Sequence, residues 1–597
     1  MIKRYLGRGL GAALAIVVIG IAAIPWSLSA PAVRQQLGQQ LLQATGLDMV
    51  AAGRVTFSVL PRPRLKLDKV TLERTAAGAA GPGLVIEAKN IRSDLHILPL
   101  LIGRIEVADV ELRQPIISLN PDVLAAEIPP AITQNSRVNT QNTALELPID
   151  PSQFGLIQIE SGTIRWAASQ FGAASQLDRV QLRFEWHGIE RPAAFNGNAV
   201  WNGHKIDLSA WLGTPSALLA GSASPISLKL TSDLMTLNAD GTASGNPAIA
   251  FDGKLAATTT DLSALLQMMP GNQLIPALPL KANLKAKSSI TRRATDMSDL
   301  QFGLGGSEFE GSLAIRKGVD RPLISATLAT DKMNVTPLVT KFQTLFSSDT
   351  AEGGADLRRQ FDLVDLDLRV SAARVDAGQV RLDDAALGAI MNNGRVEVSI
   401  ADAKAFGGSL KMRVSSTSAD ARERVRASGA FNDIDVKSAL KAGGLGERMS
   451  GAATGQFTLE STGSTINDIL ANLSGQTKVH IVDGEIPGLD IEQALRRADK
   501  KASSGSIEPR AGRMGFTTAD GTIDISDGNA TLLDGTVNGP GAILALSGQF
   551  GLVDHQLNLN AIARQSGDRD GTGPKLRIDL QGLFENPLLS VERASTE

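Results

Sequence analysis

The sequence predicts a mainly β protein, in which an N-terminal transmembrane helix precedes an elongated, curved antiparallel β-groove with a few short helices. Three observations support this fold class. Residues 10–28 carry no charge, many later segments alternate apolar and polar residues, and 59 of the 597 residues are glycine. Period-two alternation is typical of strands with one dry and one wet face, and glycine supplies the positive φ of tight turns.

The N-terminal segment has the pattern of a membrane anchor. A basic flank, residues 1–9, precedes the uncharged run Leu10–Leu28. About 20 apolar residues cross a bilayer as a helix, and basic flanks favour the cytoplasmic side. We therefore expect an uncleaved single-pass anchor with a cytoplasmic N-terminus, although a cleaved signal peptide is the alternative because Ser27–Ala30 offers small residues for cleavage. The expected anchor residues are Leu10, Leu14, Ile16, Val17, Val18, Ile19, Ile21, Ile24, Trp26 and Leu28.

The rest of the chain is expected to form four modules. Residues 29–126 predict a short helix followed by strands, and residues 127–151 predict a polar linker that contains proline. Residues 152–360 are expected to form a middle β-rich groove segment. Residues 361–597 are expected to form a C-terminal β module with a helical insert over residues 486–499.

Period-two alternation is clearest in six segments, which are Arg64–Glu73, Arg104–Arg113, Asp362–Val370, Arg395–Ile400, Gln556–Ala563 and Lys575–Leu580. Short strands between Gly, Asn and Asp turns favour an antiparallel meander over βαβ units. The apolar members of these strands are candidates for lining a groove. They are Leu67, Val70, Leu72, Leu366, Leu368, Val370, Leu557, Leu559, Leu576, Ile578 and Leu580.

The segment Asn472–Lys500 predicts a strand, a turn at Asp483-Gly484 and a helix over Leu489–Asp499. The apolar residues of that helix lie at helical spacing and are Leu489, Ile491, Ala494 and Leu495. Two roles remain open for it. The helix either caps the apolar face of the sheet or packs in an ordinary core.

The composition argues against several classes of chemistry. The absence of cysteine excludes disulfides, Cys-ligated metals and thiol catalysis. A net charge of −3 and an aromatic content of 4% argue against nucleic acid as a partner. The five histidines have no metal-ligand spacing, and no nucleophile elbow or phosphate-binding loop occurs. We therefore expect no cofactor, no metal and no catalytic residue, and a hydrolase on this scaffold has no positive support.

The dry faces of the strands leave two architectures open. A globular sandwich closes its apolar faces against each other, whereas an open sheet keeps one face as an apolar trough. Large exposed apolar surfaces are costly unless they serve binding. Beyond a membrane, such a trough would shield lipid acyl chains while the headgroups face water.

Several motifs together carry a family resemblance. The segments Leu41–Glu73 and His96–Leu119 resemble the N-terminal signature of the AsmA family, whereas Asn472–Lys500, Gly521–Gly541 and Gly582–Glu592 resemble its C-terminal signature. The matching structural residues are Thr45, Gly46, Gly53, Pro61, Pro63, Pro99, Gly103, Pro115, Gly475, Gly484, Gly488 and Leu489.

The resemblance implies an inner-membrane-anchored, mainly periplasmic protein of Gram-negative bacteria, similar to bridge-like lipid transfer proteins. It implies a role in outer-membrane biogenesis, with phospholipid acyl chains conducted along an apolar β-groove between the two membranes. The implied partners are the inner membrane, lipid, and an outer-membrane or periplasmic protein. The resemblance implies no catalytic residue. The alternative function is a scaffold or regulator of outer-membrane protein assembly that uses exposed sheet edges.

Overall fold

The protein is described from a computed structural model, and the chain divides into two compact units, Met1–Gly305 and Gly306–Glu597. The described residues are 38–39, 42, 47–51, 53–58, 62–75, 82–96, 107–120, 123, 155–168, 175–188, 190–245, 250–268, 280–318, 321–337, 339–340, 364–419, 422–444, 446–463, 465–500, 512–568, 573–584 and 587–594.

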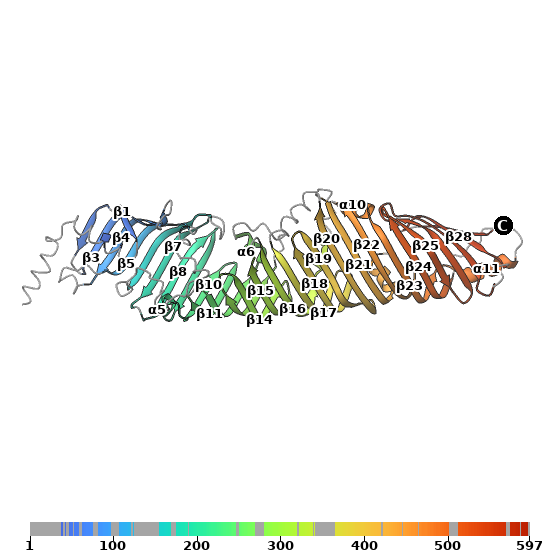
Figure 1. Cartoon of the computed structure of the whole chain (residues 1–597), viewed down its shortest axis with the longest axis horizontal. Helices are drawn as coiled ribbons and strands as arrows, with labels where there is room; N and C mark the ends of the chain where they lie inside the picture. Colours follow the sequence, from blue (N-terminus) through green and yellow to red (C-terminus); the bar gives the residue numbers. More distant parts are fainter. Residues whose placement is uncertain are drawn as a thin grey trace, which may run out of the picture. The chain divides into compact units, whose positions relative to one another are not determined.

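The first unit is mainly β (Figure 1). Its described strands are β1 (Asp48–Ala51), β2 (Val55–Ser58), β3 (Arg64–Thr75), β4 (Pro82–Leu95), β5 (Val107–Leu119), β6 (Leu156–Trp166), β7 (Ser175–Trp186), β8 (Ala193–Trp201), β9 (His204–Leu212), β10 (Ser224–Ser232), β11 (Met235–Ser244), β12 (Ala250–Thr259), β13 (Ala282–Ile290) and β14 (Ala294–Leu304). The helices whose bounds are described in this unit are α5 (Pro215–Leu219) and α6 (Leu262–Met268).

The second unit repeats this plan. Its described strands are β15 (Ser307–Lys317), β16 (Pro322–Asn334), β17 (Asp365–Ala377), β18 (Val380–Asn392), β19 (Arg395–Ala405), β20 (Gly408–Ala419), β21 (Arg422–Asp435), β22 (Ser450–Gly463), β23 (Ser474–Pro487), β24 (Arg513–Ser526), β25 (Asn529–Asn538), β26 (Ala542–Gly551), β27 (Gln556–Gln565), β28 (Leu576–Leu583) and β29 (Leu588–Arg593). The described helices are α9 (Val436–Ala442), α10 (Ile466–Ala471) and α11 (Ile491–Lys500).

Most strands pair antiparallel with the next strand in the chain, as the alternation predicts. Two pairs, β5 with β6 and β16 with β17, are parallel, so the expectation of a purely antiparallel sheet is wrong at these positions. A parallel pair needs a crossover of a dozen or more residues rather than a tight hairpin. The connections 120–155 and 335–364 have the required length, and the predicted linker 127–151 falls within the first.

Many hairpins close through a two-residue turn that ends in glycine. Asn202-Gly203 joins β8 to β9, and Asn393-Gly394 joins β18 to β19; all four residues have positive φ. Both central residues of a type I′ turn need positive φ, and that turn matches the twist of the flanking strands. The glycine-rich turns predicted in this sequence therefore set short, regular hairpins.

Bulges interrupt the period-two alternation at matching places on neighbouring strands. At a bulge, successive residues of one sheet face are three positions apart, and the residue just before the second one has positive φ. Examples are Leu67 and Val70 around Lys69, Leu112 and Pro115 around Gln114, Ile159 and Gly162 around Ser161, Leu382 and Ala385 around Asp384, Phe431 and Ile434 around Asp433, and Ile481 and Gly484 around Asp483. The extra residue bends the strand and strengthens its twist.

One of these bulges corrects a prediction. The dipeptide Asp483-Gly484 does not make a turn, because β23 continues from Ser474 to Pro487 through a bulge at Asp483 (φ 50°). On both sides of it, β23 pairs with β24: Val482 is opposite Thr518, and Gly484 is opposite Phe516. Backbone pairing on both sides therefore holds the strand together. The chain leaves the strand only after Pro487, and the helix begins at Ile491, two residues later than predicted.

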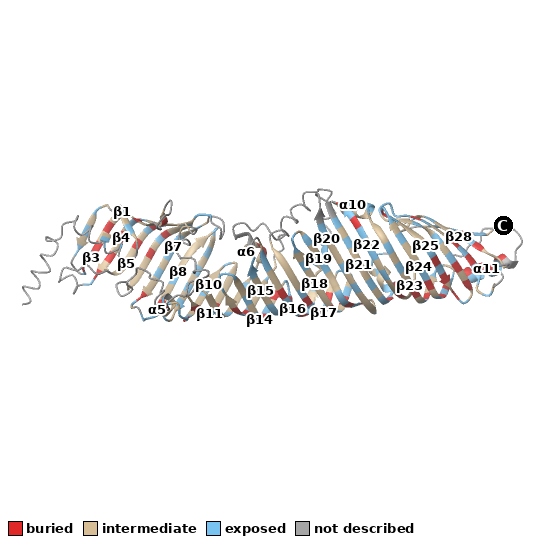
Figure 2. Ribbon diagram, viewed as in Figure 1, coloured by how far each residue is buried: buried red, intermediate tan, exposed pale blue. Residues whose placement is uncertain are grey.

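Most buried apolar side chains belong to three clusters, and Figure 2 colours the buried residues red. In the first unit, one cluster spans β3 to β7 and includes Leu65, Leu67 and Val70. In the second unit, one cluster spans β17 to β21, and a larger one spans β22 to β29 together with α9 and α11. Outside these clusters most apolar side chains of the described strands are half-buried.

The predicted membrane anchor, Leu10–Leu28, lies outside the described residues. Among the helices that the structure describes, none combines the length and the apolar character of a membrane span.

The start of α9 provides a test of local helix capping. The Asp435 side chain accepts a hydrogen bond from the Ser438 backbone N–H at 2.8 Å, and hydrogen bonding by Ser438 lowers the pKa of this carboxyl. We predict that Asp435→Ala lowers the free energy of unfolding by about 1 kcal/mol, whereas Asp435→Asn, which keeps an acceptor, costs less. Urea denaturation at neutral pH measures both.

The same carboxyl predicts a pH dependence. A lowered folded-state pKa stabilises the fold above the ordinary carboxyl pKa, and this contribution is lost as the pH falls through the folded-state pKa. The stability difference between wild type and Asp435→Ala should therefore shrink in acid. A difference that stays constant or grows as the pH is lowered would contradict the capping role.

Candidate binding face

In each unit the sheet has an apolar face and a polar face. The pairing register places apolar residues of neighbouring strands directly opposite one another. We call such a set of cross-strand partners a rung. One rung of the first unit crosses nine strands from β6 to β14. Its members are Ile159, Leu182, Gly197, Leu208, Leu230, Leu237, Ala257, Leu284 and Phe302.

This rung is only partly covered. Ile159 is buried, but the other eight members are half-buried. An adjacent rung runs on the same face through Ile157, Phe184, Phe195, Ala210, Leu228, Ala239, Leu255 and Ala286. Two neighbouring apolar rungs that keep their register across many strands form a continuous apolar surface. The sequence analysis did not single out these residues, although alternation in the segments that contain them carried the signal.

The apolar face of the second unit contains eight of the eleven predicted groove residues, and Leu67, Val70 and Leu72 lie on β3 of the first unit. Leu366, Leu368 and Val370 of β17 lie opposite Met391, Ala389 and Leu387 of β18. Leu559 and Leu580 face each other across β27 and β28, as do Ala561 and Ile578. All eleven predicted groove residues are buried or half-buried. Leu67 and Val70 share a face only because of the bulge between them. Whether any of these side chains contacts lipid remains a prediction.

Phenylalanine side chains cover glycines on the apolar face. Phe431 lies opposite Gly455, and Phe457 lies opposite Gly429. A Cβ atom added to Gly455 would lie 2.5 Å from Cζ of Phe431, and one added to Gly429 would lie 2.7 Å from Cζ of Phe457. Because glycine has no side chain, it leaves space that the aromatic ring of the neighbouring strand fills. The ring keeps the face apolar at these positions.

The opposite face carries a lattice of ion pairs. Arg64 pairs with Asp94 across β3 and β4, and Lys404 pairs with Asp384 across β19 and β18, each at 2.6 Å. Hydrogen bonding to Asp384 raises the pKa of Lys404, although the pair is solvent-exposed. Exposed pairs of this kind contribute little to stability because solvent screens them. Their main effect is to keep this face wet and thereby to specify which face is dry.

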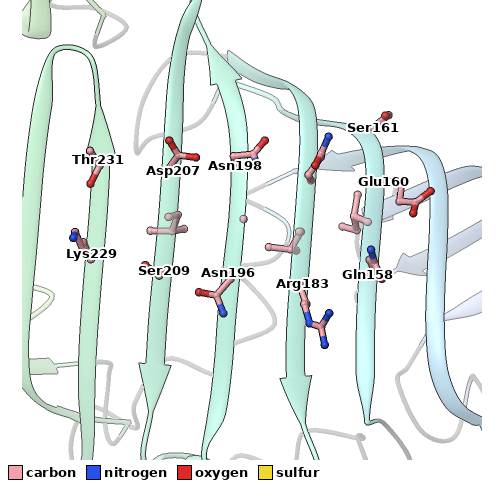
Figure 3. A pocket seen from close by; sticks show the side chains of 15 residues that line it. Gln158, Glu160, Ser161, Arg183, Asn196, Asn198, Asp207, Ser209, Lys229 and Thr231 are labelled. Atoms are coloured by element: carbon pink, nitrogen blue, oxygen red, sulfur yellow. The ribbon is translucent and has the colours of Figure 1, made fainter.

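The polar face of the first unit contains a hollow of about 860 Å³ over β6 to β10 (Figure 3). Four carboxamides line it, from Gln158, Gln181, Asn196 and Asn198, together with charged groups that include Arg183 and Lys229. These carboxamides make no side-chain hydrogen bond to another described residue, so they are solvated. No local sequence pattern predicts this hollow, because its residues lie on five strands and come together only when those strands pair.

The family-motif residues have structural positions where they are described. Pro63 and Pro115 are buried, and Pro115 follows a bulge on the dry face of β5. Gly475 and Gly484 lie within β23, Gly488 follows it with φ 84°, and Leu489 packs against the large cluster of the second unit. A Cβ atom at Gly53 would lie 2.6 Å from the carbonyl oxygen of Asp68. Thr45, Gly46, Pro61, Pro99 and Gly103 lie outside the described residues.

Two histidines lie within hydrogen-bond distance of a carboxylate, which the sequence did not predict. His204 contacts Asp233 at 2.7 Å, and His480 contacts Asp520, its partner across β23 and β24, at 2.6 Å. Hydrogen bonding to His204 lowers the pKa of Asp233. Within the described part of the chain, no group of three or more His, Cys, Asp or Glu residues could hold a metal ion.

Comparison with known proteins identifies a family for this chain. The family model described as AsmA family matches residues 2–254 and 248–534. A comparison with curated proteins gives no match.

The pairing of Phe431 with Gly455 yields a prediction. A side chain at Gly455 must displace the ring or the carbonyl oxygen of Lys478, which would also lie 2.5 Å from the added Cβ. We predict that Gly455→Val destabilises the protein by about 1–3 kcal/mol, as overpacking typically does. Gly515→Ala in β24 is the control, because its Cβ would meet no atom within 4 Å. Equal urea midpoints for the two variants would contradict this account.

Proposed function

Since this chain belongs to the AsmA family, we propose that it is a non-enzymatic protein of the bacterial envelope. In this proposal it binds phospholipid acyl chains along its apolar sheet faces and conducts them between the inner and outer membranes. In this proposal residues 10–28 anchor the protein in the inner membrane, and the bulk of the chain lies in the periplasm, forming the groove. The partners are the two membranes and the lipid.

The observation that carries this proposal is the pair of mostly half-buried apolar rungs, one of which crosses β6 to β14 and the other β6 to β13. Burial of a methylene group contributes about 0.8 kcal/mol, so an acyl chain on such a face is held without a polar pocket. Contact with lipid also covers apolar surface that otherwise faces water, which is costly for a protein to leave open. The headgroup remains in water.

Movement along the face needs no chemistry from the protein. Neighbouring rung members are separated by the spacing of paired strands, about 4.8 Å, and each offers the acyl chain a contact similar to the last. An acyl chain that slides by one strand therefore exchanges one set of apolar contacts for an equivalent one. Regular spacing of equal contacts favours movement over tight binding at one place.

A second candidate function, a scaffold for outer-membrane protein assembly, is favoured by one feature. Among the described strands β29 pairs only with β28, and its Leu588 side chain is 74% exposed. An edge strand with unpaired backbone groups is a template for a strand of another protein. Co-purification of a stable outer-membrane-protein complex, with no lipid, would support this function instead.

We predict that the gently purified full chain carries phospholipid, detected by lipid mass spectrometry. Leu208→Asp in β9 and Leu368→Asp in β17 should each remove most of that lipid, because a charge on the apolar face must remain solvated. The matched controls put the same charge on the opposite face of the same strands, as Ser209→Asp and Ser371→Asp. Both controls should retain wild-type lipid content.

Two outcomes would count against the lipid proposal. One is a wild-type protein that binds no phospholipid either after purification or after incubation with phospholipid vesicles. The other is equal lipid loss in the variants of both faces, with far-ultraviolet circular dichroism showing that all four variants keep their β content.

A further inference from the structure

We propose that α11 is a displaceable plug, which occupies part of the apolar face of the second unit and is lifted when an acyl chain enters there. This inference rests on the proposed lipid-binding function and concerns its regulation. The helix is inserted between β23 and β24, which pair directly with each other, so the sheet does not need α11 to continue from one strand to the next.

The apolar side of α11 is fully seated on the sheet. Ile491 is 0% exposed and Leu495 2%, and Ala494 and Ala498 are also buried in the large cluster. Their cluster partners include Met514 and Phe516 of β24, Leu544 of β26, Ala563 of β27 and Leu576 of β28. The helix packs against β27 and shares one buried cluster with residues of β24, β26 and β28.

Burial of the apolar face differs between the rung next to α11 and a rung further along the strands. The rung Ala519, Val537, Leu544, Ala563 and Leu576 is buried throughout. Two rungs further along, Ile523, Leu532, Leu559 and Leu580 are only half-buried, although Leu557, beyond them on β27, is buried again. The apolar face is thus covered at the end where α11 packs and partly exposed two rungs away.

The contacts that hold α11 are of the kind that an acyl chain would make. The Asp490 carboxylate accepts a hydrogen bond from the Gln493 N–H, and Arg496 pairs with Glu492, so these polar interactions lie within the helix itself. Among the described α11 side chains, residues 491–498, none forms a hydrogen bond or ion pair with a described strand. Lipid and helix therefore compete for the same apolar contacts, and neither gains a polar advantage.

The other side of α11 is suited to leaving the sheet. Glu492, Gln493, Arg496 and Arg497 are exposed with the helix in place, so they stay solvated when it lifts. Gly488, between β23 and the helix, has φ 84°, a conformation that glycine adopts without strain. The ligand shifts the helix position only by binding the open state more tightly, which is what competition for one surface provides.

A disulfide lock tests the plug directly. A Cβ atom at Gly541 would lie 2.6 Å from Cγ of Glu492, so these two positions are close enough to be tested as a disulfide pair, Glu492→Cys with Gly541→Cys. The chain has no other cysteine. The full-length protein is incubated with phosphatidylcholine vesicles that contain a pyrene-labelled phospholipid, and protein-bound label is measured. The oxidised double variant should take up several-fold less label than the same protein after reduction, whereas each single variant should be insensitive to the reductant.

A second pair of variants tests the plug without requiring the disulfide to form. Leu495→Asp should unseat the helix and raise label uptake, and Arg496→Asp, on the exposed side, should leave it unchanged. Hydrogen exchange over Ile491–Lys500 should accelerate when wild-type protein is loaded with phospholipid. The plug would be overturned, with the proposed function left standing, by one set of results. In it, wild-type protein takes up label, but the disulfide and Leu495→Asp do not change that uptake, and phospholipid does not change hydrogen exchange in α11. A wild-type protein that takes up no label would overturn both.

Discussion

Cross-strand register is the constraint on which the structure of each unit depends. Successive side chains of a strand point to opposite faces, so a slip of one residue would move every apolar side chain to the wet face. In the first unit, apolar residues meet in one rung from Ile159 on β6 to Phe302 on β14 without such a slip. The bulges preserve this arrangement because they recur at matching positions, and the face is recovered after each one. A continuous apolar surface follows from pairing alone and needs no pocket.

The two faces of the sheet are specified by different interactions, because one is apolar and the other carries charge. The wet face is specified by exposed ion pairs, which contribute little stability but keep charge off the dry face. Part of the dry face is buried, by the cluster around Leu65 in the first unit and by α11 in the second. Most other apolar side chains of the described strands are half-buried. Phenylalanine over glycine extends the apolar surface across strands that lack a side chain at that rung.

Two Asp-Gly dipeptides adopt different structures that the local sequence does not distinguish. Asp527-Gly528 makes a tight turn between β24 and β25, and both residues have positive φ. Asp483-Gly484 was expected to do the same, but it forms a bulge inside β23 because β24 pairs with the strand on both sides of it. Local conformational preference is similar in the two cases, since Asp has positive φ in both. Long-range pairing decides between a turn and a bulge.

The sequence by itself determined which residues prefer water and which avoid it, and with that the strand content and the apolar set that includes Leu67, Leu368 and Ile578. Period-two alternation and glycine turns are local signals, so they can be read without knowledge of distant partners. Only the tertiary structure decided the parallel pairs of β5 with β6 and β16 with β17, the matched bulges, and the seating of Ile491 and Leu495 on the sheet. Those features depend on which distant residues meet, and apolar surface has no directional preference that would name its partner in advance.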